Sequence, residues 1–122
     1  MMAQKALLFN DNEIFHKIMS SKSPKEYKEL GRKIKNFSDS KWNENKYQIV
    51  LKGNIAKFSQ NEKLKAFLLN TGTKILIEAS PYDKIWGIGL SADQENIENP
   101  LTWNGENLLG FALMEVRDLI SQ

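Results

Sequence analysis

The sequence contains no cysteine, one histidine, three prolines and no long apolar run. Without cysteine the chain cannot form disulfides, bind metal through thiolates or use a cysteine nucleophile, and this composition suits a reducing cytoplasm, the location we expect. The single His16 provides neither a set of metal ligands nor a Ser-His pair, so we interpret it as structural. No apolar run approaches the ~18 residues of a membrane span. Residues 1–9 do not have the pattern of a secretion signal either, and we expect no membrane partner.

The length and composition indicate a single globular domain over residues 1–122. The chain has 41% hydrophobic and 26% charged residues, an ordinary balance for a chain that can bury one real core. Its net charge of +2 is unevenly distributed, because residues 1–65 hold 14 Lys and Arg against 7 Asp and Glu, whereas residues 66–122 hold 3 against 8. A basic first part can attract phosphates. The alternative is that Lys-rich helix surfaces only keep a small protein in solution.

Helical signals fill the first two thirds of the chain. We predict a helix over residues 1–9. Residues 10–13 (Asn-Asp-Asn-Glu) resemble a capping box, with Asn10 in place of Ser or Thr, that would open a helix through Met19. Residues 23–26 (Ser-Pro-Lys-Glu) are a cleaner start signal and predict a third helix that ends near Gly31.

A long amphipathic pattern follows, for which Asp39 or Ser40 is the expected cap. Apolar residues at helical spacing form its inner face, and a second apolar group continues the pattern up to Gly72, the predicted C-cap. These residues are Tyr47, Leu51, Ile55 and Phe58, followed by Leu64, Phe67 and Leu68.

The pattern changes after Gly72. Residues 75–77 (Ile-Leu-Ile) predict a buried strand, and residues 82–104 read as loop with at most short strands. Asn104 is the predicted cap of a last helix, with an inner face of Leu109, Ala112, Leu113, Val116 and Ile120. The expected fold class is therefore α+β, mostly helical, with helices packed around a small sheet. Because a lone strand is not stable, its partners would come from residues 86–103 or from an upstream segment.

The segment SPYDKIWGIG, residues 80–89, concentrates residue types that a binding site uses. Asp83 can stabilise positive charge that develops on a sugar ring, although an aspartate after Pro-x is also common in turns. Trp86 can stack on a base or cover a ribose, or it can pack in the core. Gly87 and Gly89 can let the backbone approach a ligand or can permit a bulge. The pattern is neither a phosphate loop nor a dinucleotide fingerprint.

Other positions are candidate contacts for an anion. In WNGENLLG, residues 103–110, exposed amides at the start of the last helix could hold an anionic group, and otherwise Asn104 is a plain cap. Arg32 and Lys57 can bind a phosphate, although such cations are usually solvated surface groups.

Five blocks, in order along the chain, resemble the YbiA-like or NADAR family: MMAQKALLF, SPKEYKELGRKIKNF, KFSQNEKLKAFLLNTG, ILIEASPYDKIWGIG and WNGENLLGFALMEVRDLI. The resemblance implies a hydrolase, an N-glycosidase that cleaves a ribosyl C1′–N bond. The family is associated with NAD and ADP-ribose metabolism, with removal of ADP-ribose from modified guanine, and with phosphorylated intermediates of riboflavin biosynthesis. It implies no redox cofactor and no metal. The implied partner is a small ribose-phosphate or ADP-ribose substrate, with ADP-ribosylated nucleic acid as an alternative, and a homo-oligomer is compatible with it.

The resemblance also implies a role for each matching residue. Asp83, in the block P-x-D-x-x-W-G-x-G, is the candidate catalytic carboxylate, and Trp86 is its catalytic companion on the base or ribose. The implied substrate-binding set is Arg32, Lys57, Gly87, Gly89, Asn104 and Asn107. In this set the cations of the GR and KF blocks would meet the phosphate or the leaving base. The glycines would shape the loop, and the asparagines of the N-x-L-G block would border the pocket.

The start of the chain departs from the family pattern. Family members carry an acidic residue before the segment that matches residues 1–9, and an aromatic-rich region further upstream that contributes strands and pocket wall. Relative to that pattern we expect an N-terminally truncated domain without these strands. A missing acid would cost ~10²–10⁴ in rate. The alternative function is therefore a catalytically impaired ADP-ribose or nucleotide-binding module, and the motif at residues 83–89 argues against a purely structural helical scaffold.

Overall fold

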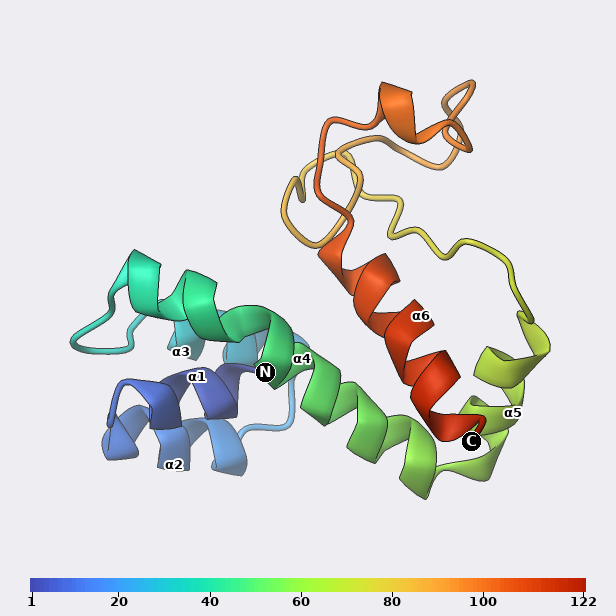
Figure 1. The fold of residues 1–122 in the computed structure, drawn as a ribbon. Coiled ribbons are helices and arrows are strands. Elements are labelled where there is room, and N and C mark those ends of the chain that lie inside the picture. The colour runs from blue at the N-terminus through green and yellow to red at the C-terminus, as the bar shows by residue number, and fades with distance from the viewer. The chain divides into compact units, whose positions relative to one another are not determined.

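Helices and the loops between them make up the chain (Figure 1). A computed structural model describes residues 1–122. The elements are α1 (Met2–Leu8), α2 (Asn12–Ser20), α3 (Pro24–Gly31), α4 (Asp39–Gln60), α5 (Glu62–Asn70), the 3-10 turn η1 (Pro100–Thr102) and α6 (Leu108–Ile120). They form two compact units, residues 1–49 and 50–122, whose boundary falls within α4. None of these helices has the length and apolar character that crossing a membrane requires.

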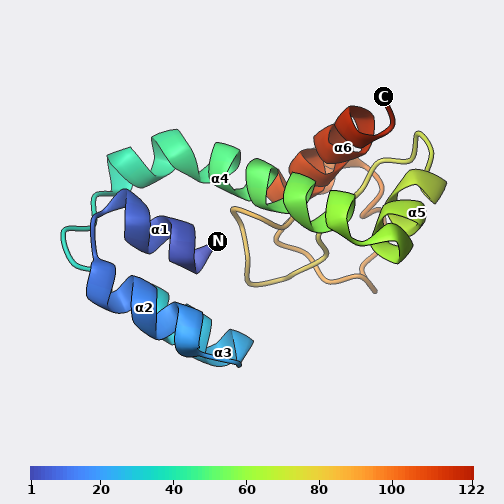
Figure 2. The same cartoon turned by 90° about the horizontal axis from the view of Figure 1, so that it is seen from below.

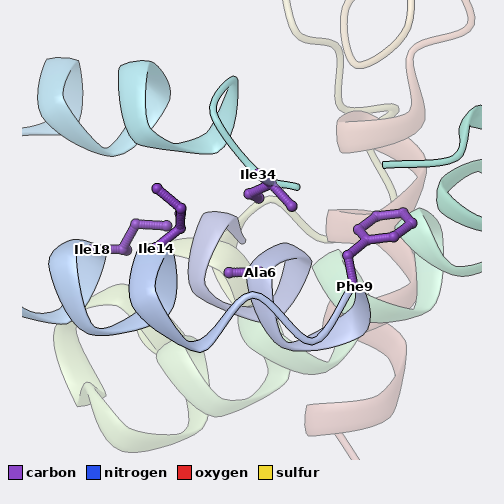
Figure 3. Packing of buried hydrophobic residues seen from close by; sticks show 5 residues of the cluster. All are labelled: Ala6, Phe9, Ile14, Ile18 and Ile34. Carbon is purple, nitrogen blue, oxygen red and sulfur yellow. The ribbon is translucent and has the colours of Figure 1, made fainter. Parts of the chain in front are cut away.

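The first unit is built on three short helices that pack against one another, α1, α2 and α3 (Figures 1 and 2). The apolar side chains at its centre come from α1, α2 and the segment after α3. They are Ala6, Phe9, Ile14, Ile18 and Ile34 (Figure 3). Ala6 is fully buried, and the small side chain lets the neighbouring helices approach closely. The three predicted helices of this part of the chain are confirmed.

The residue that caps α2 is Asp11, not Asn10. Asn10 has a φ of +58°, and the N–H groups of Asn10 and Asp11 donate to Leu7 and Ala6 at 3.1 and 2.9 Å. This is the pattern of a left-handed residue that closes a helix, so Asn10 ends α1. Asp11 then opens α2, because its Oδ1 accepts the N–H of Ile14 at 3.1 Å. In the short connection between the two helices, Asn10 thus ends α1 and Asp11 opens α2.

The long amphipathic pattern divides into two helices. Ser38 opens α4, because its Oγ accepts the N–H of Lys41 at 3.4 Å, whereas Asp39, one of the two expected caps, is already helical. The break comes at Asn61, whose Oδ1 accepts the N–H of Leu64 at 3.2 Å and caps α5. Gly72 follows the C-cap of α5 with a φ of +61°, as expected for a glycine that ends a helix.

The predicted strand at residues 75–77 does not form, and the chain has no sheet. Ile75 is 63% exposed rather than buried. The segment finds no second strand, and a strand requires a partner for its backbone groups. Instead, carbonyls on one side of the segment accept hydrogen bonds from the side chains of Asn107 and Arg117. The mostly helical part of the fold prediction is therefore confirmed and its small sheet is wrong.

Candidate functional site

Asp83 is held in a tight turn by its own loop. Its Oδ1 accepts the backbone N–H groups of Ile85 at 3.1 Å and Trp86 at 2.8 Å, and its own N–H donates to Ser80 Oγ at 3.2 Å. The side chain is half-buried, and its second oxygen, Oδ2, makes no hydrogen bond within the chain. The turn therefore fixes the direction of the carboxylate and leaves one of its oxygens for another partner.

The loop that carries Asp83 is joined to the start of α6 by a series of backbone hydrogen bonds. The N–H groups of Glu106, Asn107, Leu108 and Leu109 donate to the carbonyls of Lys84, Gly87, Ile85 and Trp86 at 2.9–3.1 Å, and that of Asn104 donates to Ile88 at 2.8 Å. Two predictions are corrected by this arrangement. The helix begins at Leu108 with Asn107 as its N-cap, so Asn104 is not the cap. The amides of residues 106–109 at this helix start already have carbonyl partners and are not free to hold an anion.

The two glycines of the Asp83 loop, Gly87 and Gly89, lie where another part of the backbone approaches closely. A β-carbon on Gly87 would stand 2.8 Å from the carbonyl oxygen of Asp83 and 2.9 Å from that of Glu78. Gly89 has a φ of +71°, and a β-carbon there would stand 3.0 Å from that of Asn104. Real β-carbons essentially never approach as closely as one on Gly87 would, and a β-carbon on Gly89 would be unusually close as well as strained by the positive φ, so a larger residue at either position would push the two segments apart. The glycines therefore shape the loop.

Asn107 connects the start of α6 to residues 76–78 from a fully buried position. Its φ is +54° and its exposed fraction is 0%. The Nδ2 group donates to the carbonyl of Leu76 at 3.0 Å, and Oδ1 accepts the N–H of Glu78 at 3.0 Å. The side chain contacts backbone and positions the segment that leads into the Asp83 loop, while its expected role at the border of a pocket stays a prediction.

The NADAR domain model matches residues 1–121. The chain belongs to the NADAR family. Among its relatives is an N-glycosidase of Acanthamoeba polyphaga mimivirus, 50% identical over 97% of this chain and 69% of the relative.

Two other relatives of this NADAR chain come from bacteria and plants. The N-glycosidase YbiA of Escherichia coli is 30% identical over 93% of this chain and 64% of its own length. The chloroplastic riboflavin biosynthesis protein PYRR of Zea mays is 32% identical over 88% of this chain, but the match covers only 16% of the plant protein. The chain thus spans about two thirds of the length of the viral and bacterial relatives.

The second unit of the NADAR chain brings most of the predicted site residues into one locality, and two cations lie elsewhere. Trp86 is half-buried beside Asp83 in sequence, and its carbonyl is one of those bonded to the start of α6. Asn104 is exposed and lies against Gly89. Lys57 is exposed in the last turn of α4, with its Nζ 5.7 Å from the centre of the Phe58 ring. Arg32 belongs to the first unit, where it is the exposed C-cap of α3.

Sequence reasoning missed two residues that organise this locality. Ser80 accepts the N–H of Asp83, and its position three residues before the aspartate is the available signal. Arg117 is 8% exposed, and its Nη1 donates to Thr71 Oγ1 and to the carbonyl of Lys74, both at 2.8 Å. An arginine on the otherwise apolar face of α6 is the signal that could have identified it.

The charged groups of the loop do not form a metal site. No group of three or more His, Cys, Asp or Glu side chains is placed to hold a metal ion.

Further along the loop, a hydrogen bond from the Ser91 hydroxyl lowers the pKa of Asp93 from its ordinary value. Asp93 and Asp83 therefore have different local partners: a hydroxyl for the first and two backbone amides for the second.

Proposed function

We propose that this NADAR chain is an N-glycosidase that hydrolyses a ribosyl C1′–N bond. The observation that carries the proposal is the carboxylate of Asp83, which two backbone amides orient through Oδ1 while Oδ2 is left without a partner. A turn with a purely structural role would make the same two hydrogen bonds to Oδ1. The names of the viral and bacterial relatives, both N-glycosidases, favour the chemical role.

The proposed reaction needs a fixed negative charge near the sugar. As the C1′–N bond breaks, its electron pair leaves with the heterocycle nitrogen, which takes up a proton, and positive charge develops on C1′ and the ring oxygen. Water then adds its oxygen to C1′ and releases one of its two protons, so one proton is taken up by the nitrogen, one is released by the water, and the sugar keeps a hydroxyl on C1′. Asp83 would stabilise the cationic sugar and orient this water through Oδ2, and preorganised electrostatic groups of this kind are worth about 10²–10³ in rate.

The other predicted site residues would bind the base, the ribose and the phosphate of the substrate. Trp86 would pack on the base or ribose, since base–aromatic stacking contributes about 1–3 kcal/mol per base. Gly87 and Gly89 would keep the loop backbone close to the substrate, and Asn104, which lies against Gly89, would contact the substrate from the opposite segment. Lys57 would contact the phosphate or the leaving base, since it is an exposed cation without a carboxylate partner within 4.0 Å. Arg32 is an exposed cation of the first unit, and its contact with the phosphate or the leaving base stays a prediction.

The proposed substrate is a phosphorylated ribosylamine of the kind found in riboflavin biosynthesis, or ADP-ribosylated guanine. Both contain a ribosyl C1′–N bond to a heterocycle, together with phosphate. The plant relative's name, a riboflavin biosynthesis protein, favours the first. The excess of Lys and Arg in residues 1–65 is compatible with the second, because a basic surface attracts nucleic acid.

Base release measured by chromatography tests the proposal. The full chain is incubated with a phosphorylated ribosylaminopyrimidine and, separately, with an oligonucleotide that carries ADP-ribosylated guanine. We expect release from at least one substrate, abolished by Asp83→Ala. Asp118→Ala is the matched control, because Asp118 is an exposed carboxylate on α6 of the same unit and should leave the rate unchanged.

Two outcomes would contradict the proposed N-glycosidase activity. Binding of either substrate can be measured by tryptophan fluorescence. Tight binding without base release would indicate a ribose-phosphate or ADP-ribose binding module. Absence of both binding and release would indicate a structural role. Equal loss of activity in the Asp83 and Asp118 variants would show that the carboxylate acts only through overall charge.

A further inference from the structure

The loop that carries Asp83 is closed at its base by a single carbonyl. The carbonyl oxygen of Glu78 accepts the N–H of Ser80 at 3.1 Å and that of Ile88 at 2.9 Å, so the two ends of the loop meet at one atom. Ile88 has an exposed fraction of 0%, which anchors one end in the interior of the second unit. The N–H of Glu78 is itself held by Oδ1 of Asn107 at 3.0 Å. The base of the loop is therefore fixed, as in compact surface loops whose ends lie close together.

Ser80 connects this fixed base to the aspartate. Its side-chain Oγ accepts the N–H of Asp83 at 3.2 Å, and this is the one backbone hydrogen bond that residues 81–83 make. The bonds from Ile85 and Trp86 to the Asp83 carboxylate lie within the turn and set its shape. The bond to Ser80 instead ties the aspartate to the segment before it. A serine hydroxyl suits this task, because it can bond to backbone groups a few positions along the chain.

The Ser80 side chain is itself held in place. Its residue is half-buried, and its own N–H is bound to the carbonyl of Glu78. A β-carbon on Gly87 would stand 3.3 Å from the β-carbon of Ser80, so the serine packs closely against the backbone on the far side of the loop. The hydroxyl is thus an acceptor whose position is set before any substrate arrives, as a residue that supports a functional side chain requires.

We propose that Ser80 is a positioning residue for the Asp83 carboxylate. This proposal rests on the proposed N-glycosidase function, in which Oδ2 of Asp83 faces the sugar carbon. The Ser80 hydroxyl holds the N–H of Asp83 and thereby the direction in which the side chain leaves the backbone, and it does not contact the substrate. A misplacement of about 1 Å at a reacting centre can cost about 10²-fold in rate, so a bond of this kind has a large effect on turnover.

Steady-state base release by variants of the full chain tests the proposal. Ser80→Ala removes the acceptor and should lower kcat about tenfold or more while KM stays within about twofold, since the carboxylate acts mainly in the transition state. Ser80→Thr keeps an Oγ in the same place and should restore most of kcat. Ser91→Ala is the matched control. It removes a hydroxyl that donates to a different carboxylate, Asp93, and should leave both constants unchanged.

Amide hydrogen exchange measured by NMR gives a second readout that needs no substrate. The N–H groups of Ile85 and Trp86 are protected by their bonds to Asp83 Oδ1. If the Ser80 hydroxyl holds the turn, these two groups should exchange about two- to tenfold faster in Ser80→Ala, as expected for the loss of one hydrogen bond. Their exchange should be unchanged in Ser80→Thr and in Ser91→Ala.

Three results would overturn the proposal. They are unchanged exchange of the two amides in Ser80→Ala, a loss of activity that appears in KM alone, and a threonine variant as slow as the alanine variant. Failure of the proposed function would be seen differently, because the unmodified chain would then release no base from either substrate. In that case the exchange measurement still decides whether Ser80 holds the Asp83 turn.

Discussion

Asn107 holds Glu78 through a hydrogen bond of 3.0 Å from the backbone N–H of Glu78 to the side-chain Oδ1 of Asn107, across 29 positions of the sequence. The other half of the same amide donates to Leu76. One buried side chain thereby links the start of α6 to the segment that leads into the Asp83 loop.

We expect Asn107→Ala to lower the free energy of unfolding by about 2–5 kcal/mol. The substitution leaves a carbonyl and an N–H without partners, at about 1–3 kcal/mol each, and places alanine at a positive φ. Urea denaturation followed by tryptophan fluorescence measures the loss. Asn104→Ala is the control, because Asn104 is exposed and its side chain makes no hydrogen bond in the chain, so the change should stay within about 0.5 kcal/mol. Similar losses in both variants would contradict the special role of Asn107.

Two glycines in helices predict substitutions of opposite sign. A β-carbon on Gly110 would stand 2.6 Å from Asn107 Oδ1, so Gly110→Ala should destabilise the protein by about 1–3 kcal/mol. Gly53, in α4, has nothing within 4 Å of such a carbon, so Gly53→Ala should stabilise by about 0.5–1 kcal/mol through helix propensity. Urea denaturation of the two variants side by side checks both signs. A stabilising Gly110→Ala would show that the approach of α6 to Leu76 is looser than described.

Asp11 predicts an acid-sensitive contribution to the stability of the first unit. Its Oδ2 accepts the N–H of Lys35 at 2.8 Å and its Oδ1 that of Ile14, and these bonds lower its pKa from the ordinary 3.8. Because the folded pKa lies below the unfolded one, the contribution is present above about pH 4 and is lost as the pH falls through the folded pKa.

Thermal denaturation of the unmodified chain and Asp11→Ala at neutral and acid pH checks this window. The difference in stability between them should be clear at neutral pH and should shrink below about pH 4. Glu29→Gln, at an exposed carboxylate of α3 in the same unit, should show no such convergence. A difference that stays constant with pH would mean that Asp11 acts through packing alone.

Local signals explain how much of this structure could be predicted. Helix α3 has proline at its first position and ends at the expected Gly31, because both signals act within one or two turns. Asn10 is misread as the opening of α2 and Asn61 is not recognised as the cap of α5, since an asparagine can end one helix or open the next, and only the φ or the side-chain bond decides. The strand at residues 75–77 failed for a different reason: strand formation depends on a partner that local sequence does not contain. The same limit hid the structural roles of Asn107 and Arg117, whose partners lie 29 to 46 positions away.

The two roles of Asp83 can be separated by Asp83→Asn. Asparagine keeps an Oδ1 that can accept from Ile85 and Trp86, so this variant should unfold within about 0.5 kcal/mol of the unmodified chain. Alanine removes the acceptor and should cost about 1 kcal/mol, as the loss of a helix cap does. If the charge serves the proposed reaction, base release should fall about 100-fold or more in both variants. Stability and initial rates measured on the same samples distinguish the cases, and an asparagine variant with full activity would reduce Asp83 to a turn residue.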